Sequence, residues 1–194
     1  MSTQTSPSAS AAQALFRVAL GGVLVAHGSQ KLFGWFGGSG IEGTSKGMHA
    51  MGFRPATPSA VLAGLGEAGA GVALALGLAT PAAGSVAAIT MGVAASVHAP
   101  NGFFATNGGF EYPAVLGLAA ASFTIGGAGR ASLDAATGQI FDRPWMRVAA
   151  LAAIPAAIGG QVYRRRQALA ADAAAAHPIA PVEGKSADPI APES

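Results

Sequence analysis

The sequence contains no cysteine among its 194 residues. Without thiols the chain cannot form disulfides, thiolate metal sites or CxxC redox motifs, and it cannot use covalent thiol catalysis. Any redox chemistry must therefore use a bound cofactor or a diffusible carrier.

Charge is also scarce. Charged residues make up 10% of the chain, whereas about 25% is usual in soluble domains. Apolar residues make up 51%. The basic residues lie near the ends of apolar segments rather than in one patch, namely at Lys31, Lys46, Arg54, Arg164, Arg165 and Arg166. This distribution argues against nucleic acid as a partner and favours contact with membrane lipid.

Four apolar segments have roughly the 20 residues needed to cross the hydrocarbon core of a bilayer. They run over about residues 11–33, 58–79, 82–99 and 111–128. The first has no basic region before it and no clear cleavage site, so we expect a retained membrane helix rather than a removed signal peptide. Small residues at positions 64, 68, 71 and 75 have the spacing that lets membrane helices approach closely.

A fifth apolar stretch, residues 145–163, ends against three consecutive arginines. Its length fits a membrane span, and a helix lying on the membrane surface is the alternative. We predict an all-α membrane protein, a four-helix transmembrane bundle with a fifth, C-terminal transmembrane helix. The predicted parts are a disordered N-terminus (1–10), the core (11–128), a polar connection (129–144), the fifth helix (145–163) and a disordered tail (164–194).

Five crossings would place all the basic residues named above on one side, which should be the cytoplasmic side. Four crossings would separate the arginine triplet from the first connection. The chain also contains an echo, because His27, Phe33 and Gly37-Gly38 recur as His98, Phe104 and Gly108-Gly109 at a constant offset of 71 residues. The echo indicates two helical hairpins of parallel orientation, with coincidence in a glycine-rich chain as the alternative.

Six polar residues from the four core segments share one half of the membrane: His27, Lys31, Glu67, His98, Glu111 and Tyr112. An ionisable group at such depth costs about 3 kcal/mol or more. One interpretation is structural pairing, Glu67 with Lys31 or His27 and Glu111 with His98. Another is a site for a quinone, whose carbonyls need proton donors while its ring and tail are apolar. A haem b between His27 and His98 is a less favoured alternative, because most such histidines are structural. The spacing shows no non-haem metal site.

Three stretches together resemble the DoxX family of membrane proteins. The first is Arg17, Gly21-Gly22 and His27-Gly-x-Gln30-Lys31-Leu-Phe-Gly, the second is Glu67 in a glycine-rich helix, and the third is Gly108-Gly109-Phe110-Glu111-Tyr112-Pro113. The resemblance runs from about Leu15 to Gly129. It implies a multi-pass protein of the bacterial plasma (inner) membrane with four core helices. The family is associated with respiratory or sulfur redox chemistry, and its name comes from a subunit of a thiosulfate:quinone oxidoreductase.

The resemblance also implies partners, since some actinobacterial relatives are thought to join a superoxide dismutase and a sulfurtransferase in oxidative-stress defence. We therefore expect a membrane redox subunit that binds a quinone or relays protons to one, in contact with lipid, with such redox proteins and with further copies of itself. The expected catalytic residues are His27, Lys31, Glu67 and Glu111, and the expected ligand-binding residues are Arg17, Gln30, His98 and Tyr112. A non-catalytic scaffold for partner oxidoreductases and a small-solute permease are the alternatives.

Overall fold

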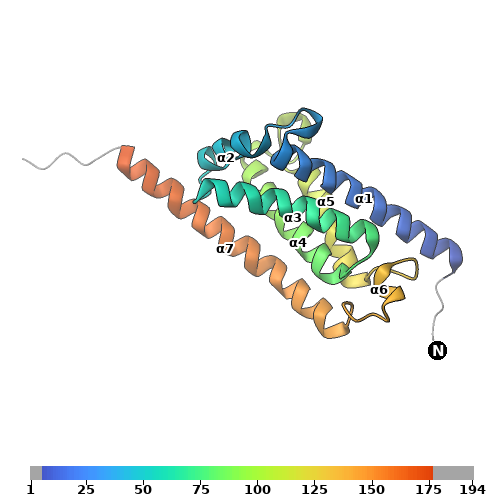
Figure 1. Cartoon of the computed structure of the whole chain (residues 1–194). Coiled ribbons are helices and arrows are strands. Elements are labelled where there is room, and N and C mark those ends of the chain that lie inside the picture. Colours follow the sequence, from blue (N-terminus) through green and yellow to red (C-terminus); the bar gives the residue numbers. More distant parts are fainter. Residues whose placement is uncertain (1–5, 177–194) are drawn as a thin grey trace, which may run out of the picture.

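Helices account for all the regular secondary structure in residues 6–176, the part of the chain that this computed structural model describes. The elements are α1 (Pro7–Phe33), η1 (Trp35–Gly37), α2 (Gly40–Ala50), α3 (Ala56–Leu76), α4 (Thr80–His98), η2 (Ala99–Asn101), η3 (Ala105–Asn107), α5 (Glu111–Gly126), α6 (Leu133–Ala136) and α7 (Pro144–Ala176). Figure 1 shows α1, α3, α4, α5 and α7 running along one common direction.

Helices α1, α3, α4 with η2, and α7 are long and apolar enough to cross a membrane. Helix α5 has 16 residues and is shorter, but it lies along α4 inside the bundle. The predicted fold class, an all-α transmembrane bundle with an additional C-terminal helix, is confirmed.

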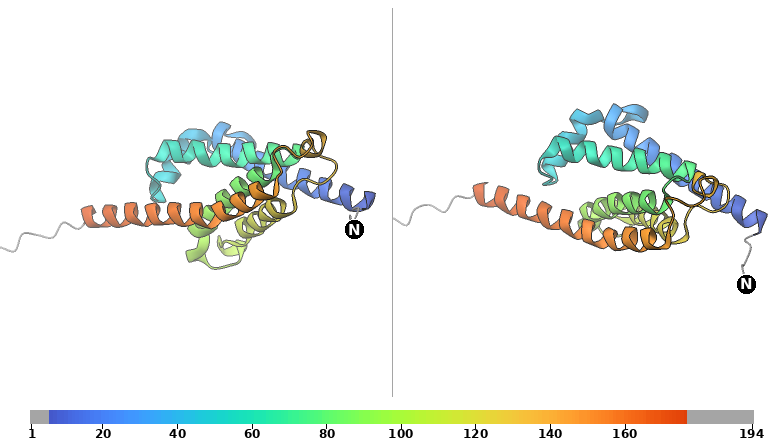
Figure 2. Two further views of the ribbon diagram at one scale, coloured as in Figure 1. Left: turned by 90° about the horizontal axis from the view of Figure 1, so that it is seen from below. Right: turned by 60° about the horizontal axis from the view of Figure 1, so that its bottom comes forward.

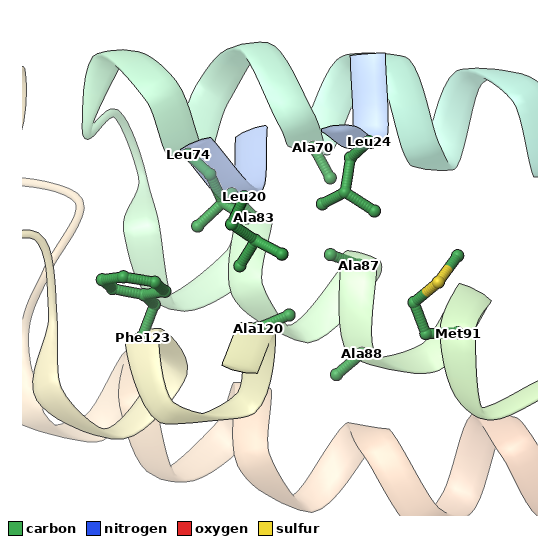
Figure 3. Packing of buried hydrophobic residues seen from close by; sticks show 10 residues of the cluster. All are labelled: Leu20, Leu24, Ala70, Leu74, Ala83, Ala87, Ala88, Met91, Ala120 and Phe123. Carbon is green, nitrogen blue, oxygen red and sulfur yellow. The ribbon is translucent and has the colours of Figure 1, made fainter. Parts of the chain in front are cut away.

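The bundle is built from two hairpins, because α1 packs mainly on α3 and α4 packs mainly on α5. Helix α3 joins the hairpins through α4, and α7 packs on α4 and more lightly on α5 (Figure 2). This pairing agrees with the two hairpins that the internal echo indicates. The buried apolar core lies where the hairpins meet, with Leu24 and Leu74 on one side and Ala87 and Phe123 on the other (Figure 3).

Glycines set the distance between α1 and α3. A Cβ atom on Gly28 would lie 2.5 Å from the backbone nitrogen of Ala68, and one on Gly71 would lie 2.6 Å from the carbonyl oxygen of Gly21. The small-residue spacing noted in the sequence therefore lies at a helix contact. Such contacts stabilise membrane helices through close packing of the two backbones.

The first helix begins earlier, and the last helix ends later, than the sequence predicts. Helix α1 begins at Pro7 within the stretch expected to be disordered, because the Ser6 hydroxyl accepts a hydrogen bond from Ala9 N (3.2 Å) and proline suits the first turn. Helix α7 continues to Ala176, through the first part of the expected tail, because that part is rich in alanine, the strongest helix former. The rest of both expected disordered segments, 1–5 and 177–194, lies outside the described residues.

The two connections also contain more structure than expected. Residues 34–57 include α2, and residues 129–144 include α6. The α2–α3 connection lies against the last turns of α7. Arg54 Nη2 is 2.7 Å from Asp172 Oδ2, and Arg165 Nε donates to the carbonyl oxygen of Met51 at 2.8 Å. The first connection and the arginine triplet thus share one end of the bundle, as five crossings require.

Candidate functional site

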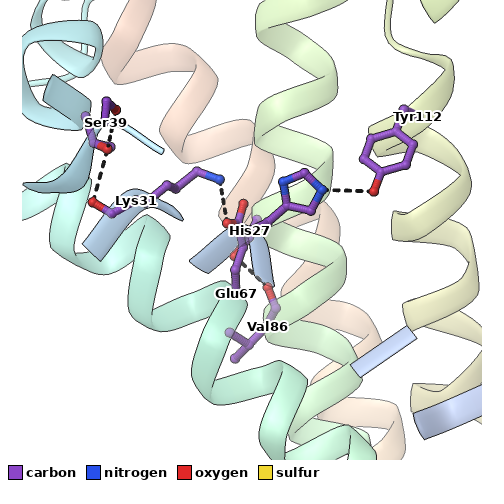
Figure 4. Close-up of polar contacts among 8 residues, drawn as sticks. His27, Lys31, Ser39, Glu67, Val86 and Tyr112 are labelled. Carbon is purple, nitrogen blue, oxygen red and sulfur yellow. Dashed lines mark hydrogen bonds and ion pairs between the residues drawn. The ribbon is translucent and has the colours of Figure 1, made fainter. Parts of the chain in front are cut away.

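A buried ion pair joins the last turns of α1 to the middle of α3. Lys31 Nζ lies 2.5 Å from Glu67 Oε2 (Figure 4). Only 3% of the Glu67 side chain is exposed, against 28% for Lys31. Of the two partners that the sequence left open for Glu67, the structure selects Lys31. The close approach of α1 and α3 at Gly28 brings the two charges together.

His27 forms a separate contact. Its Nε2 atom lies 2.9 Å from the hydroxyl of Tyr112, and the two ring centroids are 5.5 Å apart (Figure 4). Because Tyr112 lies in the first turn of α5, this hydrogen bond links α1 to the second hairpin. This contact shares no residue with the Lys31–Glu67 pair, although Figure 4 shows both contacts at a similar level of the bundle.

The expected pair of Glu111 with His98 is not formed. His98 Nδ1 donates to the carbonyl oxygen of Gly108 at 2.8 Å, and Glu111 Oε2 accepts from the backbone nitrogen of Ala105 at 3.0 Å. Both side chains therefore fix the connection between α4 and α5. The reason is that this connection folds back on itself, with Glu111 N donating to the carbonyl oxygen of Phe103, so backbone groups are the nearest partners.

Two further expected ligand-binding residues lie apart from the ion pair. Gln30 Nε2 donates to the carbonyl oxygen of Phe36 at 3.3 Å, which holds the turn after α1. Arg17 is buried near the other end of α1, about 15 Å from His27 at the rise of an α-helix. Its guanidinium donates to the carbonyl oxygens of Ala128 and Ala131 at 2.5 and 2.7 Å, so it fixes the chain that follows α5.

A cavity of about 440 Å³ lies beside the ion pair. Its polar lining comes from Lys31, Ser59, Glu67, Thr90, His98 and Gln161. The rest of the lining is apolar or glycine: Met48, Met51, Phe53, Leu62, Ala63, Gly66, Val86, Ile89, Val93, Ala94 and Val97. Mostly apolar walls with a few converging polar groups are typical of small-molecule sites, which usually measure 300–1,000 Å³.

The arrangement of the helices explains the cavity. Helices α3 and α7 both pack against α4 rather than against each other; α3 and α4 supply most of the lining, and α7 supplies Gln161. The α2–α3 connection closes one end, where Gly52, at a φ of +86°, lies directly beneath Leu169 of α7. Lys31, Glu67 and His98 are the expected site residues that the structure brings to this cavity; the lining does not include His27, Glu111 or Tyr112.

Sequence reasoning missed Gln161 as a lining residue. Its signal was present, because it is the single hydrogen-bonding side chain within residues 148–162. It also missed Asp134 of α6, which is fully buried and accepts hydrogen bonds from the backbone nitrogens of Ala79 and Thr80 at 2.8 and 2.9 Å. Asp134 thereby caps α4, whose preceding residue Ala79 offers no capping side chain.

The model of the DoxX family matches residues 12–100. No curated protein and no solved structure matches the chain. The matched range covers α1 from residue 12 onward, α2, α3 and α4, and it contains every residue that lines the cavity except Gln161.

Proposed function

Residues 12–100 of this multi-pass membrane protein belong to the DoxX family, and from that premise we propose that the chain is a subunit of a respiratory or oxidative-stress redox system whose cavity binds a quinone. The proposed location is the bacterial plasma membrane. The proposed partners are oxidoreductases that exchange electrons with the bound quinone, a superoxide dismutase and a sulfurtransferase among them.

The observation that carries the proposal is the buried Lys31–Glu67 pair at the wall of an apolar cavity. A quinone has an apolar ring and carbonyl oxygens that accept hydrogen bonds. The ammonium group of Lys31 has three N–H donors, of which the contact with Glu67 uses one. The remaining donors can orient a carbonyl oxygen, while the apolar lining holds the ring and excludes water.

Reduction of a quinone to a quinol consumes two electrons and two protons, and in this proposal the electrons come from a partner oxidoreductase. Lys31 donates the proton at Nζ to the carbonyl oxygen, and the Glu67 carboxylate then takes up a proton delivered from water through His98 and passes it to Lys31. A second such cycle supplies the second proton. His98 lines the same cavity and is exposed at the end of α4. Since its Nδ1 is engaged with Gly108, its Nε2 is the ring nitrogen available to take up protons from water.

The remaining expected site residues have positioning roles in this proposal. The His27–Tyr112 hydrogen bond fixes the second hairpin relative to α1, and Glu111 fixes the connection before α5. Neither His27 nor Glu111 needs to touch the quinone.

The proposal is tested by equilibrium binding of decylubiquinone to the full-length protein in lipid nanodiscs. Replacing Lys31 with methionine removes a charged donor, so Lys31→Met should weaken binding by about tenfold or more. Lys46 provides a matched control, because its ion pair with Glu42 lies on the exposed surface of α2, with 76% and 83% of the two side chains accessible. Lys46→Met should bind as the wild type does.

Two results would overturn the proposal. One is the absence of saturable binding by the folded wild-type protein, which would favour a non-catalytic scaffold. The other is equal weakening by Lys31→Met and Lys46→Met, which would show that binding responds to net charge rather than to the cavity.

A further inference from the structure

We infer that Gln161 of α7 is a second ligand-binding residue of the cavity and that its amide binds the quinone carbonyl opposite the one held by Lys31. This inference rests on the proposed function. It extends the site beyond the DoxX range, because Gln161 is the one lining residue outside residues 12–100.

The first argument is chemical. Gln161 stands in an apolar stretch, and its amide has no hydrogen-bond partner among residues 6–176. The Gln161 side chain is exposed, so its amide donors and acceptor are available to a ligand in the cavity. Gln161 is the one residue of α7 in the cavity lining, and a bound carbonyl oxygen would be a suitable partner for its amide.

The second argument is positional. Ser85 Oγ donates to the carbonyl oxygen of Ala150 at 2.7 Å, and Ile158 lies against Gly92, so α4 and α7 run parallel with a constant offset of 65 or 66 residues. Gln161 therefore lies level with residue 95 of α4. Figures 1 and 2 show α7 running alongside α4.

Glu67 can be placed on the same scale. Gly66 of α3 lies against Thr90 of α4, so Glu67 lies near the level of residue 89. Glu67 of α3 and Gln161 of α7 thus lie on different sides of α4. Their levels differ by about six residues of α4, which is roughly 9 Å along the bundle axis. Lys31 and Gln161 both have long side chains, and in this proposal a ring with carbonyls on opposite edges lies between them.

The close approach of α7 to α4 explains how α7 places the Gln161 amide at the cavity. Glycine at position 92 leaves no side chain beneath Ile158, since a Cβ there would lie 2.3 Å from Ile158 Cδ1. Helix α7 therefore approaches α4 closely one turn before Gln161. The hydrogen bond from Arg165 Nε to the carbonyl oxygen of Met51 fixes α7 one turn after Gln161.

The test uses Gln161→Met, which keeps side-chain length and helix propensity while removing the amide. The matched control is Gln167→Met on the same helix. Gln167 is exposed, donates to the hydroxyl of Tyr163 at 2.8 Å and does not line the cavity. Two probes are titrated into full-length protein in nanodiscs: 2,3-dimethyl-1,4-naphthoquinone, with two carbonyls, and 1-tetralone, with one.

Gln161→Met should weaken binding of the naphthoquinone about two- to tenfold, the usual value of one neutral hydrogen bond. It should leave the affinity for 1-tetralone unchanged, because Lys31 holds the single carbonyl. Gln167→Met should change neither affinity. The thermal unfolding midpoint of Gln161→Met should equal that of the wild type, which a structural role of the amide would not allow.

Unchanged naphthoquinone binding in Gln161→Met, with binding by the wild type intact, would overturn this inference and leave the proposed function standing. Equal weakening for both probes would also overturn it, because the effect would then not depend on the second carbonyl. Absence of naphthoquinone binding to the wild type would overturn both proposals.

Discussion

Lys31 Nζ lies 2.5 Å from Glu67 Oε2 in the interior of the bundle, and Lys46 Nζ lies 2.7 Å from Glu42 Oε1 on its surface. The two pairs join the same residue types at almost the same distance. They differ in burial, because Glu67 has 3% of its side chain exposed and Glu42 has 83%. The exposed pair therefore serves as an internal control for the contribution of the buried pair to the free energy of unfolding.

We predict that Glu67→Gln lowers the free energy of unfolding by about 2–3 kcal/mol, because Lys31 loses its counter-charge in a largely buried site. Glu42→Gln should lower it by less than about 0.5 kcal/mol, since exposed pairs on one helix contribute little. Reversible unfolding in mixed detergent micelles measures both. Equal losses in the two variants would contradict the burial argument.

Gly28→Ala should destabilise the first hairpin. The added Cβ would lie 2.5 Å from Ala68 N, so α1 and α3 must separate along their whole contact, and we expect a loss of about 2 kcal/mol by analogy with overpacked cores. Gly22→Ala is the matched control, because a Cβ on Gly22 meets nothing within 4 Å. The same unfolding assay applies, and a Gly28→Ala variant as stable as Gly22→Ala would show that the contact is looser than described.

Much of this fold follows from the sequence for a simple reason. Apolar segments of about 20 residues, small residues at helical spacing and the clustering of basic residues at segment ends each have one dominant explanation in a membrane. The Lys31–Glu67 pair could be anticipated because few other charges are available at that depth. In contrast, the partners of His98 and Glu111 depend on how the residues between them fold back, and sequence spacing does not determine that path.

The connection between α5 and α7 shows the same limit. Asp134 looks like an ordinary polar loop residue in the sequence, yet it is fully buried and caps α4 from 55 residues away along the chain. Its role depends on a tertiary contact that local patterns do not reveal. The length of α7 was also underestimated, since alanine-rich sequence without bulky residues fits both a disordered tail and a continuing helix.

Asp134→Ala should therefore lower the free energy of unfolding by about 2–3 kcal/mol, because the backbone nitrogens of Ala79 and Thr80 lose their acceptors in a buried site. Asp172→Ala is the control. Asp172 is 56% exposed in its ion pair with Arg54, so we expect a loss below about 1 kcal/mol. A larger loss in Asp172→Ala than in Asp134→Ala would contradict this account of α6.

The absence of native cysteine permits a direct test of topology. Single variants Lys46→Cys, Ala136→Cys and Ala173→Cys place a thiol in α2, α6 and the end of α7 respectively. With five crossings, a membrane-impermeant maleimide should label positions 46 and 173 from the cytoplasmic side and position 136 from the opposite side. Labelling of positions 136 and 173 from the same side would show that α7 does not cross.

The most direct test of the quinone site is photolabelling with an azidoquinone in nanodiscs, followed by mass spectrometry of the labelled peptides. If the cavity binds quinone, the label that excess unlabelled quinone displaces should lie on lining residues such as Met48, Val93 and Gln161, and Lys31→Met should abolish it. Label confined to exposed residues of the outer surface, such as Leu15 and Leu118, and insensitive to competition would contradict the quinone site.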